Sequence, residues 1–260
     1  VLTNVDLSGI SLAGTVMTSA NISGASTNLT RLVSGTITGL DTATLPTGYV
    51  ARNGYIIGAG VNASGAALSN QTISSVNMTG IDLSGATLTN SNFTSWILTN
   101  ANMTNGVMNS VTFTGATMIN ATLSSAVLSS SNFTSANLTG AVLTSANMTS
   151  TTLTSANMTN ANLTGAFLTS ATLTSSTLTN ANLTGATLTN AVVQGNIVDV
   201  TTATLPTGYV ARTITTATNG FIFGPRLLIQ SSTLTGVDLS GIALTSANFI
   251  GSNLTNVNIT

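Results

Sequence analysis

The sequence predicts an all-β solenoid, in which the chain turns a corner every five residues, with two β-hairpin-like inserts. The first observation is that a large apolar residue occupies every fifth position from 68 to 193 without a miss. The second is that the other positions of each pentapeptide are mostly small or polar. The third is a duplicated segment that interrupts the repeat twice. Helices and strands have periods of about 3.6 and 2, so a period of five indicates a repeat architecture.

Each pentapeptide of the central block has the same pattern around its large apolar residue. Two positions before it, Ala is the most frequent residue, and two positions after it every residue is Gly, Ser or Asn. The consensus Ala-Asn-Leu-Thr-Gly/Ser/Asn appears at 136–140, 161–165 and 181–185. This pattern predicts that Leu and Ala lie inside the coil while Thr and Asn face solvent.

The consensus resembles that of the pentapeptide-repeat family, Ala-Asp/Asn-Leu-x-x, and the resemblance covers most of the chain. It implies a right-handed quadrilateral β-helix with four pentapeptides per coil. The sequence gives an independent indication of this coil size, because Phe93, Phe113 and Phe133 recur at every fourth pentapeptide. Four pentapeptides per coil would stack the three rings in one column, which adds to the energy of their burial.

The same period continues at both ends in other frames. One run begins at Leu2, reaches Ile22, and resumes at Leu32 and Ile37, with Thr27 in a slot that otherwise holds a large apolar residue. Another run occupies every fifth position from 229 to 259. We therefore expect N-terminal coils at 1–39, a first insert at 40–62, a central solenoid at 63–198, a second insert at 199–226 and C-terminal coils at 227–260. Together these form one continuous solenoid.

The two inserts share a segment, because residues 42–52 and 202–212 are identical at all eleven positions. In the first copy, Asn53-Gly54 lies between two short apolar runs, which is a strong signal for a β-hairpin. The second copy carries six extra residues, so we expect a longer hairpin or a loop with a strand pair at its base.

The inserts contain all three Tyr, all three Pro and most of the charged residues of the chain. One interpretation is that they contact a partner or another subunit. The other is that they are decorations inherited with a duplication. The candidate contact residues are Tyr49, Arg52, Tyr55, Tyr209, Arg212, Phe221 and Arg226.

Composition excludes several classes of function. Only 3 % of residues are charged, and the chain has no Glu, Lys, His or Cys. Four scattered Arg cannot supply the basic field that nucleic-acid binding needs. Zinc and iron–sulfur sites, and nucleophiles activated by His, are excluded, so we expect no cofactor, no metal and no enzyme activity. No apolar run approaches the about 18 residues of a membrane span, so we expect no membrane insertion.

Several single residues have two interpretations. Trp96 occupies a slot that usually holds Ala, so it either fills the core or marks a contact. Asp6, Asp82 and Asp238 share the motif Asp-Leu-Ser-Gly, and we expect them to be solvated surface groups. Asn-x-Ser/Thr sequons such as that at Asn132 are potential glycosylation acceptors, but the consensus produces them automatically.

Two outward columns differ in character if four pentapeptides make one coil. One would form a Thr-rich face and contains Thr72/Ser74, Asn92/Thr94, Thr112/Thr114, Asn132/Thr134, Thr152/Thr154 and Thr172/Thr174. The next contains Val107, Val127 and Phe167, which predict an apolar stripe for lateral contact.

The expected function is structural. The coils show no evident cap at either end, and an uncapped solenoid exposes unpaired backbone groups over an apolar core. Stacking of the first coil of one copy on the last coil of another would give a head-to-tail homopolymer, a filament or matrix built by self-association. The low charge removes repulsion that would oppose association, and the dependence on Ser, Thr and Asn for wetting suits an extracellular or cell-surface location.

The alternative is a surface- or ligand-binding solenoid with a Thr-rich face, similar to ice-binding solenoids. DNA mimicry is not expected, because Asp82 is the one charged residue of the central repeats.

Overall fold

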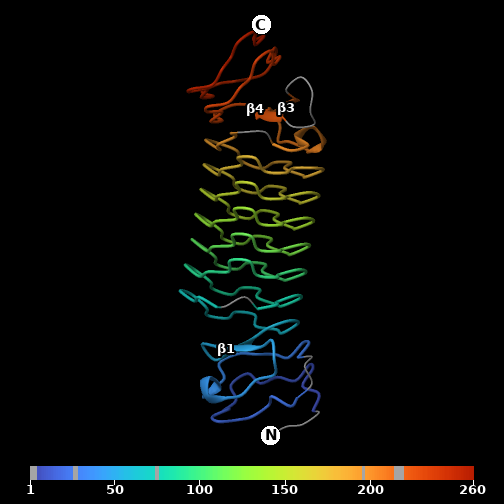
Figure 1. Ribbon diagram of the computed structural model, residues 1–260, viewed down its shortest axis with the longest axis vertical. Coiled ribbons are helices and arrows are strands. Elements are labelled where there is room, and N and C mark those ends of the chain that lie inside the picture. The colour runs from blue at the N-terminus through green and yellow to red at the C-terminus, as the bar shows by residue number, and fades with distance from the viewer. Residues whose placement is uncertain (1–4, 26–28, 74–75, 195–196, 214–219) are drawn as a thin grey trace.

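The computed structural model describes residues 5–25, 29–73, 76–194, 197–213 and 220–260. The chain forms a four-sided rod of stacked coils, with the N-terminal coils at one end and the C-terminal coils at the other (Figure 1). The elements longer than single bridges lie at the two inserts. They are the 3₁₀-helices η1 (Leu40–Thr42) and η2 (Val200–Thr202) and the strands β1 (Val50–Arg52), β2 (Tyr55–Ile57), β3 (Val210–Thr213) and β4 (Gly220–Phe223).

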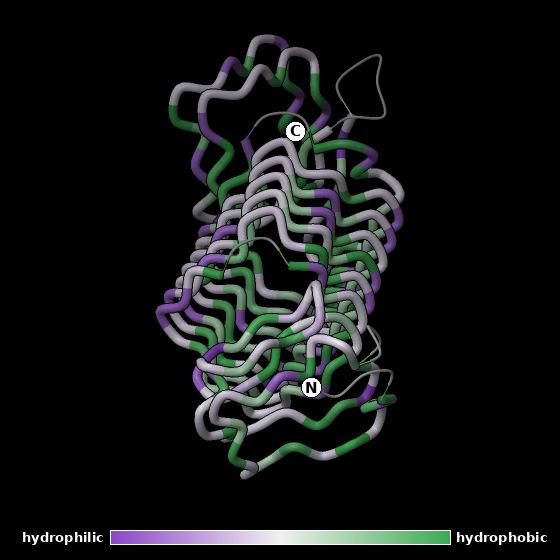
Figure 2. Tube along the Cα trace, turned by 60° about the horizontal axis from the view of Figure 1, so that its bottom comes forward, coloured by the Kyte–Doolittle hydropathy of each residue, from purple (hydrophilic) through white to green (hydrophobic). Residues whose placement is uncertain are grey.

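Each side of a coil pairs in parallel with the same side of the next coil, four pentapeptides later. Thr87 pairs with Val107, and Val107 pairs with Val127. A regular side makes three hydrogen bonds to the next coil, as in Leu83 N to Asn102 O at 2.7 Å, Asn102 N to Ile81 O at 2.9 Å and Gly85 N to Thr104 O at 2.9 Å. The coil of four pentapeptides that the Phe spacing predicts is therefore confirmed, and the coils stack in register along the rod (Figure 2).

The four outward columns are named A to D, and each can be identified by one residue. Column A contains Asn62, column B contains Ala67, column C contains Thr72 and column D contains Asn77. Column B contains the apolar stripe, and column C contains the Thr-rich face.

The corner residue of each pentapeptide explains its restricted composition. A turn closes by a hydrogen bond from Ala86 N to Leu83 O at 3.0 Å, and Gly85 has φ 65°. At equivalent corners Ser95 has φ 59° and Asn100 has φ 58°. A positive φ at the third residue of a turn favours Gly and tolerates Asn, because a bulky Cβ would clash with the backbone. In the central block this requirement agrees with the restriction of the corner to Gly, Ser or Asn, whereas Arg31, Thr36 and Arg226 adopt a positive φ nearer the inserts.

The core runs along the axis of the rod. Every large apolar residue predicted to point inward in the central block is at most 4 % exposed. The rings of Phe93 and Phe113 stack with centroids 5.5 Å apart, and those of Phe113 and Phe133 with centroids 4.9 Å apart. In the N-terminal run, Leu7, Met17, Ile22, Leu32 and Ile37 are buried, whereas Leu2 and Thr27 lie outside the described residues.

Trp96 fills the core. Its side chain is 1 % exposed, and its ring meets Phe93 edge to face with centroids 4.0 Å apart. The indole Nε1–H donates to the carbonyl oxygen of Ile73 at 3.3 Å. The core interpretation of Trp96 is confirmed, and the contact interpretation is wrong, because a buried indole with a satisfied N–H offers nothing to a partner.

The predicted hairpin of the first insert is present, and it lies between two coils. β1 and β2 pair antiparallel, with Arg52 opposite Tyr55. At the tip, Gly54 O accepts from Ile37 N at 2.8 Å, and Asn53 Nδ2 donates to Ala67 O at 2.9 Å. The hairpin therefore stands between two coils on the side of column B, while Val33 and Asn62 still pair directly on the side of column A, and it buries Ile56 and Ile57 in the core.

The second insert has the same construction. β3 and β4 pair antiparallel, with Ala211 opposite Ile222, as Ala51 stands opposite Ile56 in the first insert. This confirms the expected strand pair, whereas residues 214–219, which connect the strands, lie outside the described residues.

The two inserts lie on opposite sides of the rod. Val33 belongs to column A, and Thr44, two sides later, pairs with Asn21 on the side of column C. Its equivalent, Thr204, pairs with Asn182 in column A. Identical segments thus leave the coil from opposite sides, and η1 and η2 lie at opposite edges of the rod in Figure 1.

Candidate functional site

The two inserts are fixed to the solenoid through equivalent tyrosines. The hydroxyl of Tyr49 accepts from Leu29 N at 3.0 Å and donates to Ala59 O at 3.2 Å. The hydroxyl of Tyr209 donates to Pro225 O at 3.2 Å. Burial raises the pKa of Tyr209, while the nearby charge of Arg226 lowers it by a smaller amount. A neutral phenol that donates to a carbonyl is what this anchoring role needs.

Glycines make room for the two tyrosine rings. A Cβ at Gly58 would overlap the ring of Tyr49, and a Cβ at Gly224 would overlap the ring of Tyr209. The segment Asn-Gly-x-Ile-x-Gly, present in both inserts, therefore ends in Gly because an aromatic ring packs directly on that backbone.

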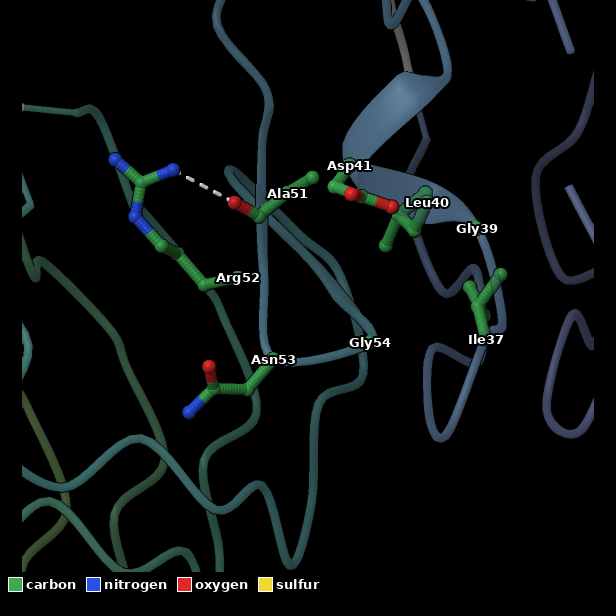
Figure 3. A pocket seen from close by; sticks show the side chains of 8 residues that line it. All are labelled: Ile37, Gly39, Leu40, Asp41, Ala51, Arg52, Asn53 and Gly54. Carbon is green, nitrogen blue, oxygen red and sulfur yellow. Dashed lines mark hydrogen bonds between the residues drawn. The ribbon is translucent and has the colours of Figure 1, made fainter. Parts of the chain in front are cut away.

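Arg52 and Arg212 fold back on their own strands. Arg52 Nη1 donates to the carbonyl oxygen of Ala51 at 2.7 Å, and Figure 3 shows this contact beside the hollow between η1 and β1. Arg212 Nη1 donates to Ala211 O at 3.1 Å, and Arg212 Nε donates to Asp238 O at 3.1 Å.

The other candidate contact residues of the inserts divide into two groups. Arg226 is exposed, and Tyr55 is half-buried beside Gly35. Phe221 is 2 % exposed and packs near Phe223, so its side chain belongs to the core. Burial therefore removes Phe221 from the set of residues that a partner could reach.

The predicted apolar stripe is aligned along column B. Val107 pairs with Val127, and Phe167 follows two coils later, beyond Asn147. Phe167 is 50 % exposed, whereas Val107 and Val127 are half-buried. The stripe thus consists of the exposed ring of Phe167 and the partly covered Val107 and Val127, and Asn147 lies between Val127 and Phe167.

The Thr-rich face is aligned along column C, but its hydroxyls are not equivalent. Thr94 Oγ1 donates to Asn92 Oδ1 at 2.7 Å, and Thr134 Oγ1 donates to Asn132 Oδ1 at 2.6 Å. Ser74 lies outside the described residues. The Asn residues of column C therefore accept hydrogen bonds from the neighbouring Thr hydroxyls and interrupt the row of Thr side chains.

These contacts also explain the abundance of Asn-x-Thr. Asn132 Oδ1 accepts both the backbone N–H and the hydroxyl of Thr134, and Asn162 makes the same pair of contacts with Thr164. The motif stabilises the turn of its own pentapeptide, as Asn does in Asx turns.

The three predicted surface aspartates face solvent or lie partly covered, each at a turn. The backbone N–H of Ser8 donates to Asp6 Oδ1 at 2.8 Å, and this bond, with the Ser8 hydroxyl, lowers the pKa of Asp6. Ser240 acts in the same way on Asp238, whose pKa is also lowered by the charge of Arg212. Asp82 accepts from Ser84 N at 2.9 Å and Asn102 Nδ2 at 3.1 Å.

The C-terminal end carries an apolar hollow that the sequence only partly predicts. This C-terminal cup has a volume of about 470 Å³. Ile259 is 73 % exposed and Leu254 is 44 % exposed, whereas their counterparts in the central block are buried. Ile242 and Val257 were missed, although a large residue in an Ala slot signals them. The cup is lined by Leu239, Ile242, Leu244, Phe249, Leu254, Val257 and Ile259.

Backbone groups are also unpaired at the two ends of the described coils. At the C-terminal end, the N–H groups of Leu244, Phe249 and Leu254 and the carbonyls of Ile242, Ala247 and Ser252 have no partner within the described residues. At the N-terminal end, both backbone groups of Ser11, Val16 and Asn21 are unpaired in the same sense. These are the positions whose equivalents inside the rod hydrogen-bond to the next coil.

Two kinds of feature are missing from the described ranges. They contain no group of three or more Asp, Glu, His or Cys side chains arranged to hold a metal ion. They also contain no helix whose length and hydropathy would let it cross a bilayer.

Comparisons with known proteins identify the repeat. A family model described as pentapeptide repeats matches in eight copies, at residues 1–26, 59–90, 72–105, 88–129, 121–160, 131–169, 151–190 and 229–260. A search of curated protein sequences finds no significant match.

Solved structures of pentapeptide repeat proteins are similar to the chain. HetL, from the cyanobacterium Nostoc sp. strain PCC 7120 and involved in regulation of heterocyst differentiation, is 19% identical over 99% of this chain and 88% of its own, with a TM-score of 0.42. A protein of the Arabidopsis thaliana thylakoid lumen is 33% identical over 36% of this chain and 66% of its own, with a TM-score of 0.36. QnrB1, a plasmid-mediated fluoroquinolone resistance protein, is 16% identical over 72% of this chain and 90% of its own, with a TM-score of 0.28.

The matched copies cover most of the chain and leave out residues 27–58 and 191–228, which contain the hairpins of the two inserts. The predicted family and its right-handed quadrilateral β-helix are therefore confirmed, and the chain belongs to the pentapeptide repeat family.

Proposed function

We propose that this protein is a structural, non-catalytic solenoid that assembles with copies of itself by end-to-end stacking. The observation that carries the proposal is the match between the backbone groups that the first and the last described coils leave unpaired. Inside the rod, Leu83 N donates to Asn102 O and Asn102 N donates to Ile81 O. In the last described coil, the unpaired N–H of Leu244 and C=O of Ile242 correspond to the groups of Leu83 and Ile81. In the first described coil, the unpaired C=O and N–H of Val16 correspond to those of Asn102.

Stacking would satisfy these groups in the way that the interior coils do. Each side of an interior coil makes three backbone hydrogen bonds, and a net contribution of about 0.5–1.5 kcal/mol for each makes a four-sided junction substantial. Water satisfies the same groups in the free protein, so the net gain is much smaller than the gross bond energy.

The C-terminal cup would supply the hydrophobic part of the junction. Burying one exposed Leu or Ile side chain contributes about 1.5–3 kcal/mol, and the cup presents Leu254 and Ile259. At the other end, Val5 and Ile10 stand in slots that usually hold Ala, and they are 37% and 45% exposed. Their bulk suits a cup that is deeper than the flat face of an interior coil.

The polarity of the junction predicts a filament. The C-terminal end of one copy meets the N-terminal end of the next, so the contact is heterologous and does not close on itself. The net charge of −1 provides little repulsion between copies. We place the assembly outside the cell or at its surface, because Ser, Thr and Asn rather than charges keep the rod wetted.

A charge placed in the cup tests this function. We expect Leu254→Asp to abolish assembly, because each junction would bury an unpaired carboxylate. The matched control is Thr245→Asp, which adds the same charge at an exposed position of the same coil. Electron microscopy and sedimentation velocity of the parent should show rods longer than one copy, the control should resemble the parent, and Leu254→Asp should give single rods. A parent that remains a single rod at every concentration would contradict the proposal.

The second candidate is a surface-binding solenoid, supported by the alignment of Thr112, Thr152 and Thr172 in column C. The interleaved Asn rows weaken it, because Thr94 and Thr134 use their hydroxyls within the chain. Thermal hysteresis and ice shaping at millimolar protein would support this candidate, and their absence would exclude ice as the surface.

A further inference from the structure

The outer edge of β1 carries free backbone groups. Asn53-Gly54 forms a two-residue loop, so Arg52 and Tyr55 are the hydrogen-bonded pair beside it. The next pair, Ala51 and Ile56, must then direct their backbone groups away from each other. This orientation agrees with Ile56 N, which donates to Ser34 Oγ at 2.6 Å on the far side of β2.

Ala51 therefore presents an N–H and a C=O on the open edge of a two-stranded sheet. Arg52 Nη1 donates to the carbonyl, while the N–H donates to no group of the described residues. β3 is equivalent, because Ala211 stands opposite Ile222 and its carbonyl accepts from Arg212 Nη1. An open edge of this kind is where an added strand makes main-chain hydrogen bonds.

Two hollows border this edge in the first insert. One, of about 290 Å³, lies between η1 and β1 and is lined by Leu40 and Ala51 (Figure 3). The other, of about 430 Å³, is lined by Leu45, Tyr49 and Val50 as well as Ala51. Their walls combine apolar side chains with polar groups such as Asp41 and Arg52 beside the free N–H, which suits an extended segment of mixed polarity.

The identical sequence builds the same feature again in the second insert. A hollow of about 370 Å³ there is lined by Leu205, Tyr209, Val210 and Ala211. The walls thus come from matching residues of the duplicated segment, although the inserts leave the coil from opposite sides.

The guanidinium groups define the charge of a suitable ligand. Arg52 donates one hydrogen bond, to Ala51 O, and makes no ion pair with any group of the described residues. Its remaining N–H groups are therefore available, and a guanidinium pairs in a bidentate way with a carboxylate.

From these contacts we infer that β1 and β3 are twin docking sites for an extended peptide that carries a carboxylate. The peptide adds as a strand to the open edge, its carbonyl oxygen accepts from the N–H of Ala51 or Ala211, and its carboxylate pairs with Arg52 or Arg212. Because the two sites lie on opposite sides of the rod, one solenoid would link two peptide segments. This inference is independent of end-to-end stacking, since neither strand edge belongs to a terminal coil.

The two sites differ in the carboxylate that competes with the ligand. Asp41 lines both hollows of the first insert, whereas Thr201 takes its place in the second. In the second insert, Asp238 interacts with the charge of Arg212 instead. A fixed carboxylate near the ligand repels an acidic peptide. We therefore expect Asp41→Thr to strengthen binding of an acidic peptide at β1 without changing binding at β3.

The test uses the full chain and a defined probe, an acetylated peptide of alternating threonine and valine that ends in aspartate. We expect two peptides to bind per chain, with the backbone amide resonances of Ala51 and Ala211 shifting in NMR spectra. Binding at each site should fall about tenfold with Arg52→Gln or Arg212→Gln, respectively. The same peptide ending in asparagine amide should bind more weakly at both sites.

A backbone variant separates docking from simple charge attraction. Ala51→Pro removes the outward N–H without touching the bonds between β1 and β2, since Pro is tolerated on strand edges. We expect it to abolish binding at β1 while binding at β3 and the melting temperature of the chain stay unchanged. Ala211→Pro should have the mirror effect. Absence of binding at millimolar peptide, or binding that survives both Pro variants, would overturn the inference.

Discussion

The central solenoid and the two inserts bury their apolar side chains in different ways. In the solenoid, each coil is covered by another of nearly identical shape, so Leu128 and Met148, one coil apart, are both fully buried and few residues have an individual role. In the inserts, a hairpin lies across the layer, and single contacts such as the ring of Tyr49 on Gly58 hold it. Substitutions should therefore act through general burial in the first region and through specific contacts in the second.

The largest expected effect is in the central column of aromatic rings. Phe113 is fully buried between Phe93 and Phe133, so Phe113→Asp would bury an unpaired charge at a cost of several kcal/mol. We expect a large fall in melting temperature, measured by circular dichroism. The matched control is Thr112→Asp, which places the same charge at the outward neighbour. Equal melting temperatures for the two variants would show that column C does not separate inside from outside as described.

An intermediate effect is expected where the inserts rest on glycine. Gly58→Ala and Gly224→Ala would drive a Cβ into the rings of Tyr49 and Tyr209, and such overpacking costs about 1–3 kcal/mol. Gly35→Ala is the matched control, because its Cβ would meet Tyr55 at 3.5 Å, an ordinary contact. Chemical denaturation should rank the control close to the parent and both insert variants below it. If all three behave alike, the tyrosine–glycine packing is not what fixes the inserts.

The smallest effect concerns pH and lies at the ends of the rod, outside the central solenoid. The pKa of Asp6 and Asp238 is lowered in the folded chain, so their ionised forms stabilise the fold above the ordinary aspartate pKa. This contribution is lost as pH falls through the lowered values. We expect Asp6→Asn with Asp238→Asn to make the melting temperature less sensitive to acid, with little change at neutral pH. Without His, the parent should show a flat profile between about pH 5 and 8. A steep dependence in that interval would contradict it.

The sequence was most informative where one physical requirement repeats. Burial at every fifth residue and a positive φ at every corner select residue types so strongly that the coil, the stacked Phe93, Phe113 and Phe133, and both strand pairs could be predicted. Prediction was weaker for residues that stand alone. Phe221 was expected at a contact surface because composition marks the inserts as unusual, but its burial depends on how the hairpin crosses the layer, which no local pattern reveals.

The candidate sites were predicted less completely than the fold. Arg52 and Arg212 were identified as candidate contact residues, but the proposed peptide sites also need the free N–H of Ala51 and Ala211, a backbone group without any sequence signature. Similarly, the volume of the C-terminal cup and the part played by Ile242 and Val257 required the three-dimensional structure.

The sequence by itself determined the period, the inward and outward positions, the corner residues and the family, because each follows from local requirements repeated many times. Only the tertiary structure decided that the hairpins lie between coils, that two inserts with an identical eleven-residue segment leave from opposite sides, and which backbone groups stay unpaired. Those properties depend on the position along the coil at which each insert interrupts the repeat, and on contacts between residues far apart in the chain. A local sequence pattern contains no information on either.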